Sequence, residues 1–150
     1  MSNNMICDHC EVLFLIRHIK PSHIQNNEIT DEAFQLREDR MPPEEYVSFF
    51  HSRLDSVEDK IRDVKNEFKK RNYTIKKNCG FIHLNASKAS EEVNIIKEII
   101  KFKEEGYPHY GMYYISDDEI DIIEAKSILI HHSELYMNSN CASVLEQNKA

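Results

Sequence analysis

The segment that most constrains the fold is an uninterrupted apolar run over residues 12–16, VLFLI, which leads into Arg17 and His18 and stops before Pro21. Consecutive apolar side chains place apolar groups on both faces of a strand, which is typical of a central strand covered on both sides. Because side chains alternate along a strand, Arg17 shares a face with the two leucines, and His18 points to the opposite face. We therefore predict an interior strand over residues 12–19.

The same patterns predict the rest of the fold. Further strands are expected at about 46–51, 79–84 and 110–115, and helices at about 55–71, 90–105 and 117–136. Single helices between strands favour βαβ crossovers and a mixed sheet, although the long connection after the first strand leaves the direction of the second strand open. The prediction is an α/β (or α+β) fold, a single layered domain of about four strands and three helices over 11–137, with a flexible lead-in (1–10) and a flexible tail (138–150).

Charge and hydropathy narrow the class of protein. A composition of 41% hydrophobic and 30% charged residues indicates a folded, soluble domain rather than a disordered chain. A net charge of −7 disfavours general binding to nucleic acids or anionic membranes. No apolar run is long enough to span a membrane, and the first residues lack the basic start and apolar body of a signal peptide. We therefore expect an acidic, cytoplasmic protein that does not bind a membrane.

Motifs for metals and cofactors are incomplete. Cys7 and Cys10 form a C-x-x-C, which can supply half of a zinc site or a redox pair, but no second half follows, so an incidental pair of reduced thiols is the favoured interpretation. Among the eight histidines only His131 and His132 are adjacent, and they lack the i, i+4 spacing that grips a metal ion. The nucleophile-elbow and glycine-rich phosphate-binding motifs are also absent. We expect neither a metal nor a cofactor.

A few polar residues lie on strand faces that are otherwise apolar. Arg17 most needs a partner among them, because a buried charge must be paired with an opposite charge or bound to a ligand. It either pairs internally at the rim of the sheet, which is the favoured interpretation, or holds an anion in a cleft. Ser48 lies on a strand between Tyr46 and Phe50, and His109 precedes the last predicted strand. Arg17 is thus the candidate anion contact, and His18, Ser48 and His109 are the candidate catalytic residues.

One resemblance bears on these residues. The segment from Leu15 to Pro21, then Ala33-Phe34, Tyr46-Val47-Ser48 and finally His109 resembles small bacterial proteins with ADP-ribosyltransferase-like folds, such as RES-type toxins. The resemblance implies a mainly β core in which an early Arg or His, a mid-chain Tyr or Ser and a late acidic residue surround a dinucleotide. It covers scattered positions in about a third of the chain.

Two functions follow from the sequence. The absence of a complete catalytic motif favours a non-catalytic module that binds another protein. The alternative is a small enzyme that acts on a nucleotide or another anionic small molecule, and the sequence leaves open whether the protein is an enzyme. The environment of Arg17 distinguishes the two, because a paired arginine far from any cleft cannot hold an anionic substrate.

Overall fold

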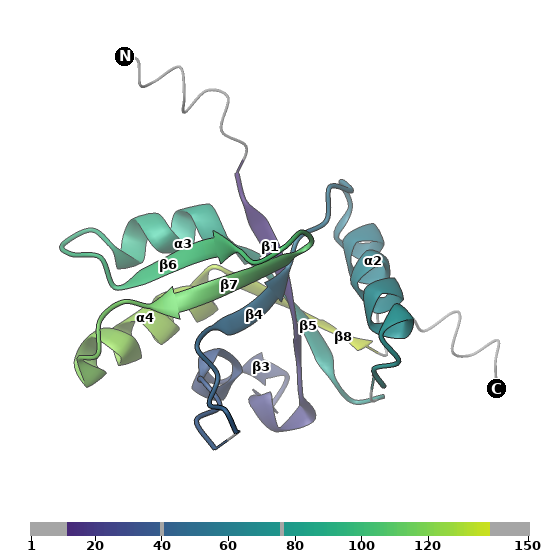
Figure 1. The fold of residues 1–150 in the computed structure, drawn as a ribbon, viewed down its shortest axis with the longest axis horizontal. Coiled ribbons are helices and arrows are strands. Elements are labelled where there is room, and N and C mark those ends of the chain that lie inside the picture. Colours follow the sequence, from purple (N-terminus) through teal and green to yellow (C-terminus); the bar gives the residue numbers. More distant parts are fainter. Residues whose placement is uncertain (1–11, 40, 76, 139–150) are drawn as a thin grey trace, which may run out of the picture.

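A computed structural model describes residues 12–39, 41–75 and 77–138, which form an α+β fold (Figure 1). The elements in chain order are β1 (Phe14–Ile19), η1 (Pro21–His23), β2 (Ile24–Gln25), β3 (Glu28–Ile29), η2 (Asp31–Phe34), β4 (Val47–Phe50), α2 (Val57–Lys70), β5 (Gly80–Asn85), α3 (Ala86–Val93), β6 (Ile100–Glu104), β7 (His109–Tyr114), α4 (Glu119–His131) and β8 (Ser133–Met137). The prediction of three main helices is confirmed. The predicted number of strands, about four, is too low.

The main sheet has six strands in the order β6-β7-β4-β1-β5-β8, and every neighbouring pair is antiparallel. The expectation of partly parallel pairing is therefore wrong, but the pattern that suggested it has a structural basis. Each of α2, α3 and α4 connects two strands that run in the same direction. The two strands are not neighbours, because β1 lies between β4 and β5, and three strands separate the other pairs. The predicted β-α-β crossovers are therefore present. The two strands of each crossover, however, pair with other strands and not with each other.

The predicted helix over residues 90–105 is wrong in both its bounds and its second half. The helix α3 ends at Val93, and the side chain of Asn94 then binds the returning backbone. Its Oδ1 accepts hydrogen bonds from the N–H groups of Ile99 and Ile100 at 2.8 and 3.1 Å, and its Nδ2 donates to the Ile100 carbonyl at 2.9 Å. This turn starts the edge strand β6, in which Ile100 is buried and the lysines that follow alternate outward.

The predicted helix over residues 117–136 ends early for a similar reason. The hydroxyl of Ser133 donates to the carbonyl of Leu129 at 2.6 Å, and the chain leaves α4 to form β8 beside β5. The helix predicted over 55–71 corresponds closely to α2, which Ser56 caps at its start and Asn72, with a φ of 61°, follows at its end. The turn at Asn26-Asn27 joins β2 to β3 and has φ angles of 53° and 62°.

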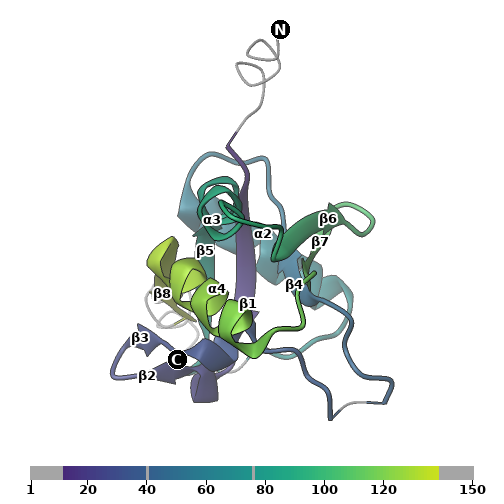
Figure 2. The ribbon, with the colours of Figure 1, turned by 90° about the vertical axis from the view of Figure 1, so that its left-hand side faces the viewer.

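The sheet has a separate core on each face. The larger core lies between the sheet and the helices α3 and α4, and the smaller one lies under α2 (Figures 1 and 2). The strand β1 belongs to both, because Leu15 and Ile19 face the larger core and Ile16 faces the smaller one. The prediction of a central strand covered on both sides is confirmed.

The sheet opens between its two central strands. The strand β1 pairs with β5 along its whole length but meets β4 at one register pair, Ile16 opposite Phe50. Beyond this pair β4 turns away with β7 and β6, which cross β1 steeply in Figure 1. The backbone carbonyl of Ser48 therefore accepts its hydrogen bond from a side chain, that of Arg17, instead of from β1.

The two ends of the chain, for which flexible segments are predicted, lie largely outside the residues that the structure describes. The lead-in over residues 1–10, with Cys7 and Cys10, and the tail beyond residue 138 lie outside the described part of the chain. Among the helices of residues 12–138 that are described, none is long and apolar enough to cross a membrane.

Candidate functional site

Arg17 bridges the opening between β1 and the segments beside it. Its Nε donates to the carbonyl of Ala33 at 2.7 Å, and its Nη1 donates to the carbonyl of Ser48 at 2.9 Å. The guanidinium carbon lies 5.9 Å from the centre of the Phe49 ring. Burial lowers the pKa of Arg17 to about 10, an effect that the nearby carboxylate of Glu44 opposes, so the side chain stays cationic at neutral pH. The arginine thus joins β1, η2 and β4 through main-chain carbonyls.

His18 lies on the opposite face of β1 from Arg17, as the alternation predicts. Its ring centre is 5.1 Å from that of Phe68 and 5.3 Å from that of Phe81. Its buried Nε2 has no hydrogen-bond partner among the described residues. Burial, followed by the charge of Arg17, lowers the pKa of His18 to about 4. His18 is thus a half-buried, neutral imidazole that packs against two phenyl rings.

The remaining two candidates also have structural neighbours. Ser48 meets Arg17 through its backbone carbonyl, so its side chain is not the group that the arginine binds. His109 lies opposite Phe50 in the sheet, with ring centres 4.8 Å apart, and its Nε2 is 2.6 Å from Nη2 of Arg71. The structure brings Arg17 and Ser48 together, and it places His18 and His109 on the α2 face. The proposed catalytic and anion-binding roles of these four residues stay predictions.

A depression of about 470 Å³ lies beside Ser48. Three of its lining residues, Glu44, Glu45 and Glu105, carry carboxylates, and Tyr46 and Tyr113 supply aromatic rings. The hydroxyl of Tyr113 donates to Oε2 of Glu105 at 2.5 Å, which raises the pKa of Tyr113 to about 12. The carboxylates make the field in this depression unfavourable for an anion that brings no counter-charge.

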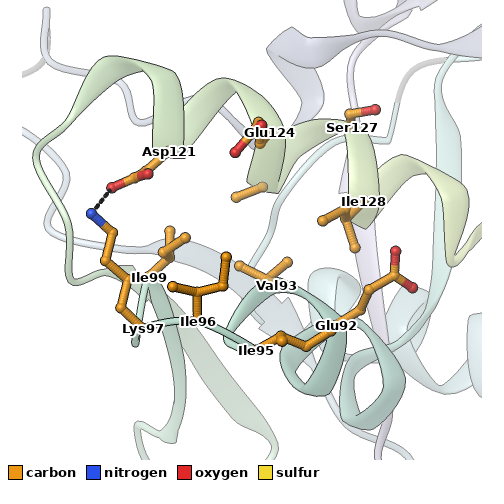
Figure 3. Close-up of a pocket in the computed structure, with 11 residues that line it drawn as sticks. Glu92, Val93, Ile95, Ile96, Lys97, Ile99, Asp121, Glu124, Ser127 and Ile128 are labelled. Carbon is orange, nitrogen blue, oxygen red and sulfur yellow. Dashed lines mark ion pairs between the residues drawn. The ribbon is translucent and has the colours of Figure 1, made fainter.

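A larger hollow lies on the other side of the sheet, between the end of α3 and the length of α4. This hollow, which we call the isoleucine groove, has a volume of about 650 Å³. Figure 3 shows residues of α3 and the following loop facing residues of α4 across it. Its apolar lining consists of Val93, Ile95, Ile96, Ile99, Ala125 and Ile128.

The isoleucines around this groove are unusually exposed for their type. Ile96 is 94% exposed and Ile95 is 74% exposed, and on α4 the side chains of Ile120 and Ile123, which do not line the groove, are 68% and 53% exposed. The opposite side of α4 is also apolar, because Ala125 and Leu129 are fully buried against the sheet. The outer side of α4 thus exposes isoleucines among its charged residues Glu119, Asp121 and Glu124, and an exposed apolar patch with a polar rim is typical of an interaction site.

The rim of the groove is mainly acidic. Glu92, Asp121 and Glu124 line it together with a single cation, Lys97. Lys97 Nζ lies 2.7 Å from Oδ2 of Asp121, so it neutralises one of these carboxylates (Figure 3). A signal for this site is present in the sequence, since α4 carries isoleucines at too many positions for one buried stripe. The predicted helix over residues 90–105 concealed it, because a helix there includes Ile96.

Other kinds of site are weakly supported. No group of three or more His, Cys, Asp or Glu side chains in the described ranges is arranged to hold a metal ion. Comparisons with protein families, with curated proteins and with solved structures find no match to this chain. The function must therefore be argued from the geometry alone.

Proposed function

We propose that this chain is a protein-binding module that holds an amphipathic, basic helix of a partner protein in the isoleucine groove. The exposed Ile95 and Ile96 on one wall of the groove, together with Ile128 on the α4 wall, are the observation that carries the proposal. Covering one large aliphatic side chain is worth about 1.5–3 kcal/mol, so a partner that covers Ile95 and Ile96 recovers a substantial part of the cost of association.

The shape of the groove favours a helical occupant. One wall is the helix α4, and the other is the end of α3 with the loop after it, so a third helix can pack against both. A helix presents apolar anchors at i, i+3, i+4 and i+7 on one side, which matches a long apolar groove. An added strand is a poorer fit, because the groove presents side chains rather than the unpaired backbone of a sheet edge.

The charge around the groove favours a basic occupant. The lining carries three carboxylates against one lysine, and the first turn of α4 adds Glu119. Lysines or arginines flanking the apolar anchors of a partner would pair with these carboxylates and increase the rate of association. An acidic helix with the same anchors would be repelled, which gives the proposal a clear electrostatic test.

The test uses two synthetic helical peptides with identical leucine anchors, one flanked by lysines and the other by glutamates. We expect the lysine peptide to bind, to bind more weakly as salt rises, and to bind about tenfold or more weakly to the Ile96→Asp variant. Calorimetry or fluorescence anisotropy measures the affinities. Ile96 is almost fully exposed, so the substitution leaves the fold intact.

The matched control is Met41→Asp, which places the same charge on another apolar residue, 92% exposed, that does not line the groove. It should leave peptide affinity unchanged. Equal binding of the two peptides, or an equal loss of affinity in both variants, would contradict the proposal. A stable dimer in sedimentation that Ile96→Asp dissolves would also contradict it, because the groove would then be covered by a second copy of the chain.

A second candidate function is an enzyme that acts on a dinucleotide, which the resemblance to ADP-ribosyltransferase-like proteins implies. One observation favours it: Arg17 binds the backbone of Ser48, and Ser48 lines the same depression as the late acidic residue Glu105. An early Arg, a mid-chain Ser and a late acid thus lie near one another. The three carboxylates of the depression weigh against an anionic substrate, so we place this candidate second.

This candidate predicts that NAD raises the melting temperature of the protein, and that water attacks the ribose of NAD to release nicotinamide and leave ADP-ribose. Glu105→Gln should abolish the release while keeping the hydrogen bond to Tyr113, because the amide oxygen can still accept it. Chromatography of the nicotinamide product measures the reaction. An unchanged melting temperature at millimolar NAD, or equal release by the variant, would exclude this function.

A further inference from the structure

A second hollow, on the α2 side of the sheet, is built around a buried lysine. It has a volume of about 340 Å³ and lies where β4 leads into α2, next to the start of β1. Its lining includes Phe14, His51, Ser52, Arg53, Asp55 and Lys60. This pocket is separate from the isoleucine groove, which lies on the α3 and α4 side. An inference about it therefore stands apart from the proposed function.

Lys60 is held in position by a chain of hydrogen bonds. Its Nζ lies 3.3 Å from Nε2 of His83, and Nδ1 of His83 lies 3.3 Å from Oε1 of Glu134. An ammonium group can only donate, so Nε2 must accept and the ring proton must be on Nδ1, where it is donated to the Glu134 carboxylate. These hydrogen bonds thus run in one direction, from the Lys60 ammonium through the neutral His83 imidazole to the Glu134 carboxylate.

Aromatic contacts fix the same two side chains. The ring of Phe14 stacks on His83 with centres 4.8 Å apart and an angle of 4° between the planes. Nζ of Lys60 lies 5.0 Å from the centre of the Phe14 ring, within the range of a cation–π contact. Lys60 is only 9% exposed, which is rare for a lysine. The fold therefore positions this ammonium group, instead of leaving it to solvent.

The hydrogen-bonding capacity of Lys60 is not used up by this arrangement. An ammonium group has three N–H donors, and the bond to His83 is the one hydrogen bond that Nζ makes within the described part of the chain. Burial lowers the pKa of Lys60, and the nearby carboxylate of Asp55 opposes this effect. A buried cation whose donors are only partly satisfied gains from an anion placed in the pocket that it lines.

The rest of the pocket also favours an anion. Arg53 brings a second positive charge, and its guanidinium carbon lies 4.7 Å from the centre of the Tyr107 ring. Ser52 Oγ accepts the backbone N–H of Leu54 at 3.3 Å, which leaves the hydroxyl hydrogen to be donated. Asp55 is the one acidic residue in the lining, against the two cations.

We infer that this pocket binds a small organic anion through a phosphate or carboxylate group, with Lys60 and Arg53 as the charged contacts and His83 and Glu134 as the residues that position Lys60. A pocket of about 340 Å³ is large enough for the anionic group together with a few attached carbon atoms. The ligand touches the ammonium and the guanidinium. Its organic part lies toward Phe14 and Leu54, which supply the apolar surface of the pocket.

The test is a titration of the full chain with inorganic phosphate and with malonate, against sodium chloride at matched ionic strength, followed by amide chemical shifts in NMR. We expect saturable shifts at Arg53, Asp55 and Lys60. Lys60→Met should weaken binding about tenfold or more, because it keeps the length of the side chain and removes the charge. Stronger binding of phosphate assigns a phosphorylated ligand, and stronger binding of malonate assigns a carboxylate ligand.

The matched control is Lys69→Met, which removes the same charge from an exposed position near the other end of α2. It should bind both anions as the unmodified chain does. Arg53→Gln is a second variant at an exposed position, and it tests the site even if Lys60→Met does not fold. The absence of saturable shifts, or equal weakening by Lys60→Met and Lys69→Met, overturns the inference.

Discussion

Replacing Arg17 with alanine is expected to lower the free energy of unfolding by about 3 kcal/mol, because it removes two hydrogen bonds from a charged donor. The loss leaves the carbonyls of Ala33 and Ser48 without the donor that bridges them. These carbonyls lie where β4 turns away from β1, so no neighbouring strand can replace the guanidinium. Urea denaturation followed by circular dichroism measures the effect.

Two control variants separate the structural role of Arg17 from the alternative role as an anion contact. Ser48→Ala should change stability little, because Arg17 binds the backbone carbonyl of this residue. Arg17→Lys should recover only part of the loss, since an ammonium group cannot reproduce the planar fork that reaches two carbonyls. An Arg17→Ala variant as stable as the unmodified chain would contradict the bridging role and restore the role as an anion contact.

The residues on β1 were the most predictable part of this fold, for a physical reason. Alternation along a strand is a local rule, so the opposite orientations of Arg17 and His18 followed from the sequence alone. The partners of these residues were not predictable. The carbonyls of Ala33 and Ser48 come from segments far along the chain, and nothing in the local pattern indicates that β1 and β4 separate at this point.

The edge strands were missed because their apolar residues fit two periodicities. Val93, Ile96 and Ile100 fit the period of a helix, whereas Ile100 and Phe102 fit the alternation of a strand. The side chain of Asn94 decides between them by capturing the backbone of Ile99 and Ile100. This capture is local, because Asn94 lies only five and six residues before them, and β6 then pairs with the next strand, β7. Ile96 then lies in the loop, exposed on the wall of the isoleucine groove.

The pocket around Lys60 could not be predicted from the sequence. Lys60 is one of many charged residues of α2, where a lysine is expected to be solvated. His83 shares a strand face with Phe81 on β5. Their contact joins a helix to a strand 23 residues later, and Glu134 joins from β8, a strand that was not predicted. The signal available in the sequence is a polar residue, His83, on an otherwise apolar strand face, and this signal does not reveal the partners of the residue.

The second large effect is expected from pH. Burial lowers the pKa of His18 to about 4 in the folded chain, against 6.5 for an ordinary histidine. Between these values the unfolded chain binds a proton that the folded chain does not, so acid favours unfolding. The contribution of His18 is fully present above about pH 6.5 and is lost as the pH falls to about 4. At about 1.4 kcal/mol for each pKa unit, the loss approaches about 3 kcal/mol.

Other histidines also make the folded chain less stable in acid, and their effect must be distinguished from that of His18. Burial also lowers the pKa values of His23, His83 and His109, so the whole chain should lose stability over this range by more than the share of His18. The variant His18→Leu replaces a buried ring whose Nε2 has no partner among the described residues, and it fills the space between Phe68 and Phe81 with an apolar group. It should remove about one proton from the pH dependence without destabilising the fold at neutral pH.

The measurement is urea denaturation at a series of pH values from 7.5 to 4, combined with an NMR titration of the imidazole signals. The matched variant is His23→Gln, whose half-buried histidine should account for a smaller part of the slope. If the His18 ring titrates near pH 6.5, or His18→Leu keeps the full slope, the ring is not enclosed by Phe68 and Phe81 in solution. The α2 face of the sheet would then be open at this point, and His18 would return as a candidate acid or base.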